Sequence, residues 1–83
     1  MKITLKYFAS IREAIGSGGE VFETTATTLG DVRDALIGRG GAYALALARG
    51  RALRVAQNQV MANETMVLLD GAEVAFFPPV TGG

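Results

Sequence analysis

The 83-residue sequence contains no cysteine and no histidine, and it has only two prolines. Without cysteine there is no disulfide, no thiolate nucleophile and no cysteine metal site. Without histidine, the side chain that most often acts as a general base near neutral pH is missing, and zinc sites built from Cys and His are excluded. We therefore expect a chain that binds no cofactor or metal and is not an enzyme on its own.

Strong net charge and long apolar runs are also lacking. Eight basic and eight acidic side chains balance, and no apolar run approaches the roughly 20 residues that span a bilayer. The alternating start does not have the form of a signal peptide, so we predict a cytoplasmic protein without nucleic-acid or membrane partners. One region is locally basic, which we interpret as a solvated face, with a docking patch for an acidic partner as the alternative. Its residues are Arg39, Arg49, Arg51 and Arg54.

Period-two alternation near the N-terminus predicts a half-buried strand. Its core-facing residues are Ile3, Leu5 and Tyr7, and Phe8 follows on the opposite side. A short helix is expected over residues 10–15, with Ser10 as a candidate cap. A second strand is expected over residues 20–25, with Val21 and Glu23 setting its alternation.

The main helix is predicted from Thr28, because Thr28 and Asp31 have the spacing of a capping box. Asp31 and Asp34 lie in its first turn, where carboxylates are favoured, so we prefer this interpretation to a metal or acid/base pair. The apolar face comprises Leu29, Val32, Leu36 and Ile37. Glycines 38, 40 and 41 are expected to stop this helix, and a second, shorter helix is expected over residues 42–48.

One or two short strands are expected over residues 53–61, and a last strand over residues 73–77 follows a turn at Asp70-Gly71. This order predicts an α+β fold: a small mixed sheet packed on one main helix plus a short second helix, as in ubiquitin. The first and last strands should be central, parallel neighbours. We predict a domain over residues 1–77 and an extended, flexible tail over residues 78–83.

Alternation in the last strand directs Val74 and Phe76 to the core and Phe77 to the opposite face. Phe77 should then lie near Phe8, and Met61 from a nearby strand should extend the exposed apolar patch. Such a patch indicates a protein interface. A one-residue error in the strand phase would instead bury Phe77 and expose Phe76.

The tail has an unusual composition. Pro78 and Pro79 favour an extended exit from the last strand, and Val80 offers an apolar anchor. Thr81 follows, and Gly82 and Gly83 have no Cβ, so they can enter a channel too narrow for other residues. We interpret this segment as a peptide that inserts into a partner's groove. The alternative is a disordered end.

The run from Val74 to Gly83 resembles the C-terminus of the MoaD family, the sulfur-carrier small subunit of molybdopterin synthase in the ubiquitin-like ThiS/MoaD superfamily. This resemblance implies the β-grasp fold. The sequence departs from the family pattern at Met61, where an aliphatic residue is common, and at Gln57, where valine is frequent. Further similar segments are Tyr7-Phe8-Ala9, Ile11-Arg12-Glu13, Ala44-Leu45-Ala46, Asn58-Gln59 and Asp70-Gly71-Ala72-Glu73.

The resemblance also implies a function. A MoeB-like enzyme would use ATP and magnesium to adenylate Gly83, and a sulfur donor protein would convert the adenylate to a thiocarboxylate. The sulfur would then pass to cyclic pyranopterin monophosphate inside a MoaE-like large subunit, in a heterotetramer of two small and two large subunits. Gly82, which has no side chain, would let the tail pass through a narrow channel in the partner. The implied interface residues are Phe8, Met61 and Phe77, with Arg12 as a further candidate.

Three alternatives remain open. The diglycine also fits a ThiS-like sulfur carrier for thiamin synthesis. It permits a ubiquitin-like modifier that is conjugated to lysines of other proteins. A structural module whose tail only docks is the third.

Overall fold

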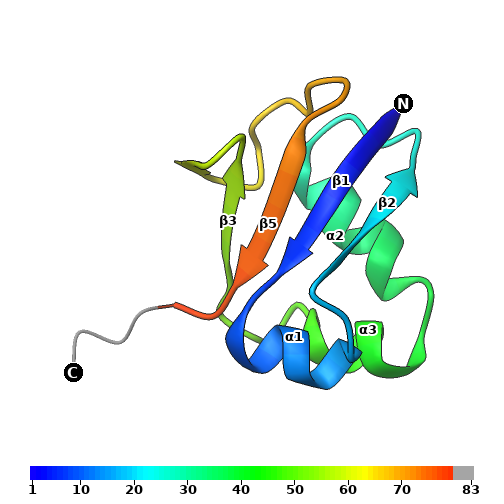
Figure 1. Ribbon diagram of the computed structural model, residues 1–83, viewed down its shortest axis with the longest axis vertical. Coiled ribbons are helices and arrows are strands. Elements are labelled where there is room, and N and C mark those ends of the chain that lie inside the picture. The colour runs from blue at the N-terminus through cyan, green and yellow to red at the C-terminus, as the bar shows by residue number, and fades with distance from the viewer. Residues whose placement is uncertain (80–83) are drawn as a thin grey trace.

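The computed structural model describes residues 1–79, which form a five-stranded mixed sheet with helices against one face and one end (Figure 1). This α+β architecture confirms the expected fold class. Along the chain the elements are β1 (Lys2–Tyr7), α1 (Ala9–Ile15), β2 (Gly19–Glu23), α2 (Leu29–Ile37), α3 (Gly41–Ala46), β3 (Arg54–Gln57), β4 (Val60–Ala62) and β5 (Glu73–Phe77).

The strand order is β2-β1-β5-β3-β4. β1 and β5 are parallel neighbours, with Leu5 opposite Val74, and the other pairings are antiparallel. The predicted pairing of the first and last strands is therefore confirmed. β5 ends at Phe77, so the chain leaves the sheet from a strand that has neighbours on both sides.

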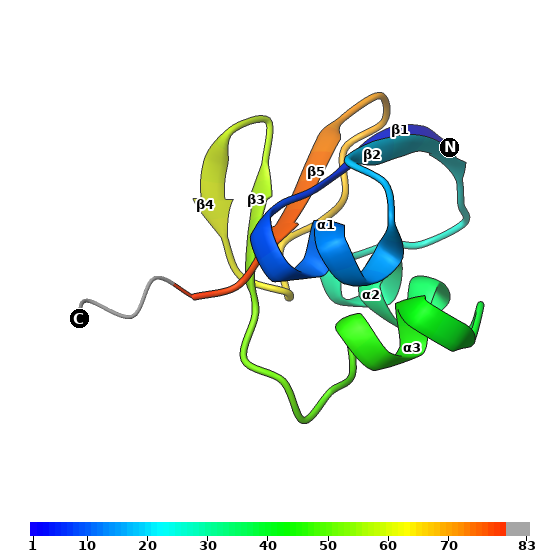
Figure 2. The ribbon, with the colours of Figure 1, turned by 60° about the horizontal axis from the view of Figure 1, so that its bottom comes forward.

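The core lies between the sheet and the helices, as Figure 2 shows. Phe76 is 1% exposed and Phe77 is half-buried on the other face, so the predicted phase of β5 is correct. The core positions predicted for β1 and for most of α2 are also buried. The largest of the fully buried side chains are Tyr7, Phe76, Ile3, Leu5, Leu29, Leu36, Leu47, Val32 and Val74.

The first third of the chain differs from expectation at the cap of α1 and at the bounds of β2. Phe8, not Ser10, is the residue that caps α1, and no side chain donates or accepts a capping bond there. In β2, Val21 is 62% exposed, whereas Phe22 packs against the core. The register explains this, because Phe22 pairs with Ile3 and thus shares its face of the sheet. The strand also begins and ends earlier than the predicted range of 20–25.

The capping box at the start of α2 is confirmed. The Thr28 hydroxyl accepts the Asp31 N–H at 3.1 Å, and the Asp31 carboxylate accepts the Thr28 N–H at 3.2 Å. The helix ends at Ile37, with Gly38 as its C-cap. Gly41 does not stop a helix but begins α3, which is shorter than the predicted range of 42–48.

A tight hairpin joins β3 and β4. Gln57 pairs with Val60, and the two residues between them, Asn58 and Gln59, have φ of 52° and 68°. Positive φ at both positions corresponds to a type I′ turn, whose twist matches that of the strands. The Asn58 side chain accepts the Glu73 N–H at 3.0 Å, which joins this hairpin to the start of β5.

Candidate functional site

A groove of about 530 Å³ lies on the face of the sheet opposite the core. Small side chains form its floor, because Ala56 and Ala75 are directly opposite each other in β3 and β5. Met61 pairs with Ala56 on one side, and Lys6 pairs with Ala75 on the other. Four strands therefore contribute one row of side chains across this groove, which we call the sheet groove.

Two phenylalanines form one end of the sheet groove. The rings of Phe8 and Phe77 meet edge to face, with centroids 6.3 Å apart and an interplanar angle of 82°. Phe8 is 47% exposed and Met61 is 51% exposed, and all three side chains line the groove. The structure thus brings together the three apolar residues that the sequence predicts to be neighbours.

The backbone around Phe8 fixes this side chain in place. Its N–H donates to the Phe76 carbonyl at 3.2 Å, and its own carbonyl accepts the Ile11 and Arg12 N–H groups. Ala9 follows with a φ of 52°, a left-handed conformation that turns the chain from β1 into α1. Phe8 is consequently held between β5 and α1.

Charged groups lie at the rim of the sheet groove. Arg12 lines it and packs over Gly18, where an added Cβ would lie 3.4 Å from the guanidinium carbon. Lys6 and Glu73 line it as well. An apolar centre with a polar rim is the usual anatomy of a protein interface. This site is therefore suited to binding another protein.

Lys6 and Ala56 also belong to this surface, although the sequence patterns did not lead us to predict them there. Lys6 is on the polar side of the first alternating strand, so the sequence already indicated that it lies on the face opposite the core. Ala56 was not assigned to a face, because the strand limits within residues 53–61 were undetermined and alanine occurs on both faces of sheets.

The structure describes two of the six predicted tail residues. Pro78 and Pro79 are half-buried and lie in neither a helix nor a strand. Val80, Thr81, Gly82 and Gly83 lie outside the described residues. The division into a domain and a tail, and the roles of these six residues, therefore stay predictions.

A cluster of hydrogen-bonded polar side chains surrounds Glu20. Its carboxylate accepts hydrogen bonds from Tyr7 at 3.0 Å, Tyr43 at 2.7 Å and Arg39 at 2.8 Å. Burial alone would raise the pKa of Glu20, but these donors outweigh it and hold the pKa below its ordinary value. Burial and the hydrogen bond to Glu20 raise the pKa of Tyr7. Each member of the cluster has a partner, and together they join β1, β2 and α3.

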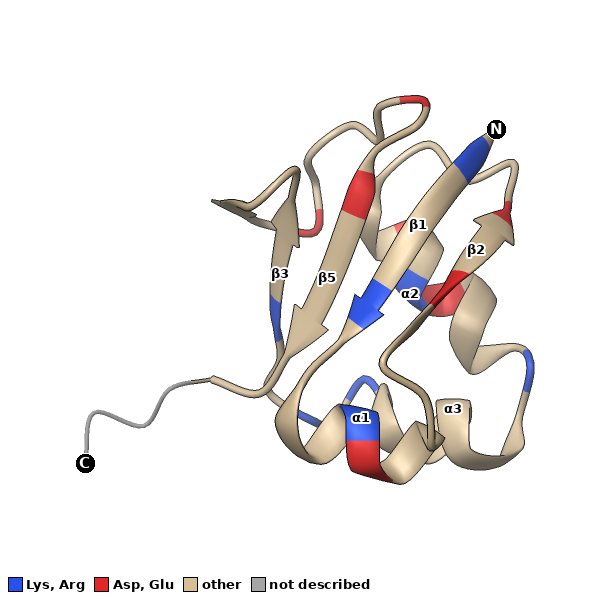
Figure 3. Cartoon of the chain, viewed as in Figure 1, with Lys and Arg blue, Asp and Glu red and all other residues tan. Residues whose placement is uncertain are grey.

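The locally basic region is partly neutralised within the fold. Arg39 pairs with Glu20, and Arg49 pairs with Asp34 and Glu64. Figure 3 shows acidic and basic residues interspersed over the molecule. Within residues 1–79, no group of three or more potential ligands is placed to hold a metal ion. The helices of this part of the chain are also too short or too polar to cross a membrane.

A mixed sheet that folds around a helix, with parallel first and last strands, defines the ubiquitin-like β-grasp fold. Residues 5–83 match the ThiS family, and the chain belongs to this family.

Three relatives illustrate the likeness. The molybdopterin synthase sulfur carrier subunit of Haemophilus influenzae is 41% identical over 81 residues, which cover 98% of this chain and 99% of the relative. SAMP1 of Haloferax volcanii is 31% identical in sequence, with a TM-score of 0.77 and full coverage of both chains. A chain in the complex of subunits 1 and 2 of molybdopterin-converting factor from Helicobacter pylori is 25% identical, with a TM-score of 0.66 and full coverage of both.

Proposed function

We propose that this chain is a sulfur carrier in molybdenum cofactor biosynthesis and acts as the small subunit of a molybdopterin synthase. The name and 41% identity of the Haemophilus relative support this proposal. One structural observation carries it further. Phe77 lines the sheet groove and is also the last residue of the strand that leads into the tail. A partner bound in this groove would therefore lie at the root of the diglycine segment.

The chemistry begins at the α-carboxylate of Gly83. A terminal carboxyl group has a pKa near 3.5, so it is ionised at neutral pH and is a poor electrophile. An adenylating, MoeB-like enzyme would join it to ATP with magnesium, forming an acyl-adenylate and releasing pyrophosphate. Sulfur from a donor protein would then displace AMP and leave a thiocarboxylate. The carrier itself contributes a presented terminus and a docking surface.

The second partner would be a MoaE-like large subunit, which would hold the catalytic residues. The Helicobacter complex of subunits 1 and 2 supports a large-subunit partner. The thiocarboxylate would enter the large subunit, with Gly82 fitting the narrow passage, and would transfer sulfur to cyclic pyranopterin monophosphate. A dithiolene needs two sulfur atoms, which suits an assembly of two small and two large subunits.

The sheet groove would bind both partners in turn. An apolar side chain of the partner would pack against Phe8, Phe77 and Met61, where desolvated aromatic residues contribute most of the binding energy. Arg12 and Lys6 at the rim would favour acidic groups beside that anchor. Because one groove serves both encounters, the activating enzyme and the large subunit should compete for the carrier.

Intact mass spectrometry tests the sulfur-carrier role. The chain is incubated with an adenylating enzyme, ATP, magnesium and a sulfur donor, and we expect the exchange of one oxygen for one sulfur. A chain that lacks Gly83 is the control and should not change. An unaltered mass in the full reaction, under conditions in which a known carrier is converted, would contradict the proposal.

A protein modifier is the second candidate, because SAMP1 of Haloferax volcanii is also described as small archaeal modifier protein 1. Isopeptide bonds between Gly83 and lysines, detected by peptide mass mapping in extracts with ATP, would favour this role. A thiamin carrier is distinguished by adding the large subunit and the pterin precursor. Dithiolene product supports molybdopterin synthesis, and its absence with a thiocarboxylated carrier favours thiamin.

A further inference from the structure

A second pocket, of about 420 Å³, lies between α1, α3 and the segment that leads into β3. We call it the helix pocket. Its walls are mostly apolar and include Ile11, Ala46 and Leu53. Pro78 lines it too, although the preceding residue, Phe77, lines the sheet groove. The chain therefore leaves β5 between two surfaces, and the proposed docking role uses only one of them.

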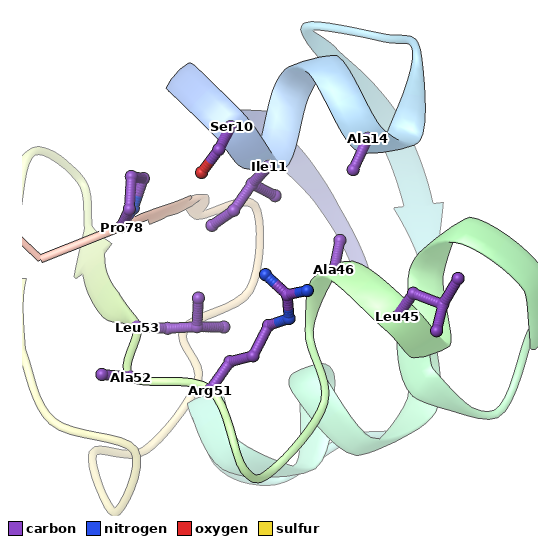
Figure 4. A pocket seen from close by; sticks show the side chains of 9 residues that line it. All are labelled: Ser10, Ile11, Ala14, Leu45, Ala46, Arg51, Ala52, Leu53 and Pro78. Atoms are coloured by element: carbon purple, nitrogen blue, oxygen red, sulfur yellow. The ribbon is translucent and has the colours of Figure 1, made fainter.

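The helix pocket contains two polar groups that could bind an anion. Figure 4 shows the Arg51 guanidinium group pointing into it, toward Ala46 and α1, with the Ser10 hydroxyl also at its wall. Among residues 1–79, neither side chain has a hydrogen-bond or ion-pair partner, whereas Arg33, Arg39 and Arg49 each have at least one. An apolar pocket with two free donors is suited to an apolar group that is followed by a carboxylate.

The loop that presents Arg51 is held rigidly. Arg33 is only 4% exposed, and its guanidinium donates to the carbonyls of Leu47 at 2.8 Å and Arg51 at 3.0 Å, and also to that of Ala48. Its remaining nitrogen pairs with Glu64 at 2.8 Å. The position of the Arg51 backbone is thus fixed by a buried side chain, which favours a preformed site over a loop that adjusts to its ligand.

We propose that the helix pocket binds the chain's own last four residues, with Val80 against its apolar wall and the Gly83 carboxylate paired with Arg51. The proposal rests on the proposed function insofar as that function gives Gly83 a free carboxylate. Four residues reach at most about 14 Å beyond Pro79, and Pro78 itself lines the pocket. Gly82 and Gly83 follow Val80 and allow the terminus to turn toward Arg51. The volume is also within the range of pockets that bind small ligands.

This contact would shelter the terminus between reactions. A tail bound in the helix pocket cannot at the same time enter a partner's channel, so partners would have to displace it. The ion pair is partly solvated, and such pairs are weak. Docked and released tails would therefore exchange readily, and the bound state would not block activation.

Nuclear magnetic resonance of the free, isotopically labelled chain tests this docking without any sulfur chemistry. We expect nuclear Overhauser contacts between the Val80 methyl groups and the methyl groups of Ile11 or Leu53. The Gly83 carboxyl, followed by its carbon shift, should have a pKa about 0.5 lower in the wild type than in Arg51→Gln. Arg54→Gln is the matched control, since Arg54 is exposed and lies outside the pocket, and it should behave as the wild type does.

The absence of these contacts in the wild type, together with equal Gly83 pKa values in the wild type and Arg51→Gln, would overturn the proposal. The contacts in the wild type suffice if Arg51→Gln fails to fold. Contacts that persist on dilution support intramolecular docking, whereas contacts that disappear on dilution assign the tail to a second copy and overturn it. A negative result leaves the mass test of the sulfur carrier unaffected, so the two proposals fail separately.

Discussion

Phe76→Ala and Phe77→Ala remove the same atoms from adjacent positions of β5, but we expect them to change different properties. Phe76 is 1% exposed and belongs to the core, whereas Phe77 is half-buried and lines the sheet groove. Phe76→Ala should therefore lower the free energy of unfolding. Phe77→Ala should mainly weaken binding to the large subunit.

The magnitudes follow from these environments. Truncation of a fully buried phenylalanine costs about 3–5 kcal/mol, out of about 4–12 kcal/mol of total stability for a domain of this length. Phe77→Ala should cost about 1 kcal/mol of stability, mostly from its edge-to-face contact with Phe8. If Phe77 is an interface anchor, its loss weakens binding by about 1–3 kcal/mol, or roughly 5- to 150-fold in Kd.

Urea unfolding followed by circular dichroism measures the first property, and calorimetric titration with the large subunit measures the second. Val21→Ala is the matched control, because Val21 is 62% exposed on edge strand β2 and does not line the groove. It should leave both values nearly unchanged. Equal destabilisation by Phe76→Ala and Phe77→Ala, or unchanged affinity with Phe77→Ala, would refute the assignment of the groove.

Substitutions at three further positions test the fold. Gln59→Gly should raise the urea midpoint, equivalent to about 0.5–1 kcal/mol, because Gln59 has a φ of 68° that glycine adopts without strain; a lower midpoint would contradict the turn assignment. Thr28→Ala should cost about 1 kcal/mol of unfolding free energy through loss of the capping box, and Thr28→Ser should retain most of it. Glu20→Gln should destabilise the chain by about 1–2 kcal/mol at neutral pH. Because the folded pKa of Glu20 is lowered, the wild type should lose this advantage as pH falls below about 4.5, and an advantage that is constant down to pH 2 would refute the ion pairing.

Local signals made the last strand and the main helix predictable. The turn at Asp70-Gly71 and the proline at position 78 bound β5 on both sides, so its limits followed from the sequence, and its alternation favoured the observed phase over the one-residue shift. Thr28 and Asp31 form their capping box within one turn of helix, which needs no distant partner. Of these two elements, β5 contributes Phe77 to the sheet groove, and α2 is the main helix that packs against the core.

Features that depend on distant partners were not predictable in the same way. Phe22 is directed inward by its pairing with Ile3, whereas the local alternation over residues 20–25 did not indicate which face Val21 and Glu23 take. Arg33 appears polar and exposed in a helical pattern, but it is buried because the carbonyls of residues 47, 48 and 51 surround its guanidinium. The helix pocket depends on that loop, so no local pattern indicated it.

The central position of β5 affects how the chain folds during translation. Its partner in the parallel pair is β1, with Val74 opposite Leu5, so the sheet joins the earliest and latest translated strands of residues 1–79. Until β5 has left the ribosome, β1 and β3 each lack a neighbour, and such open edges invite aggregation. The sheet groove is likewise incomplete, since Ala75 and Phe77 belong to β5. Only a fully translated and folded chain therefore has this surface, because two of its lining residues are among the last to be synthesised in residues 1–79.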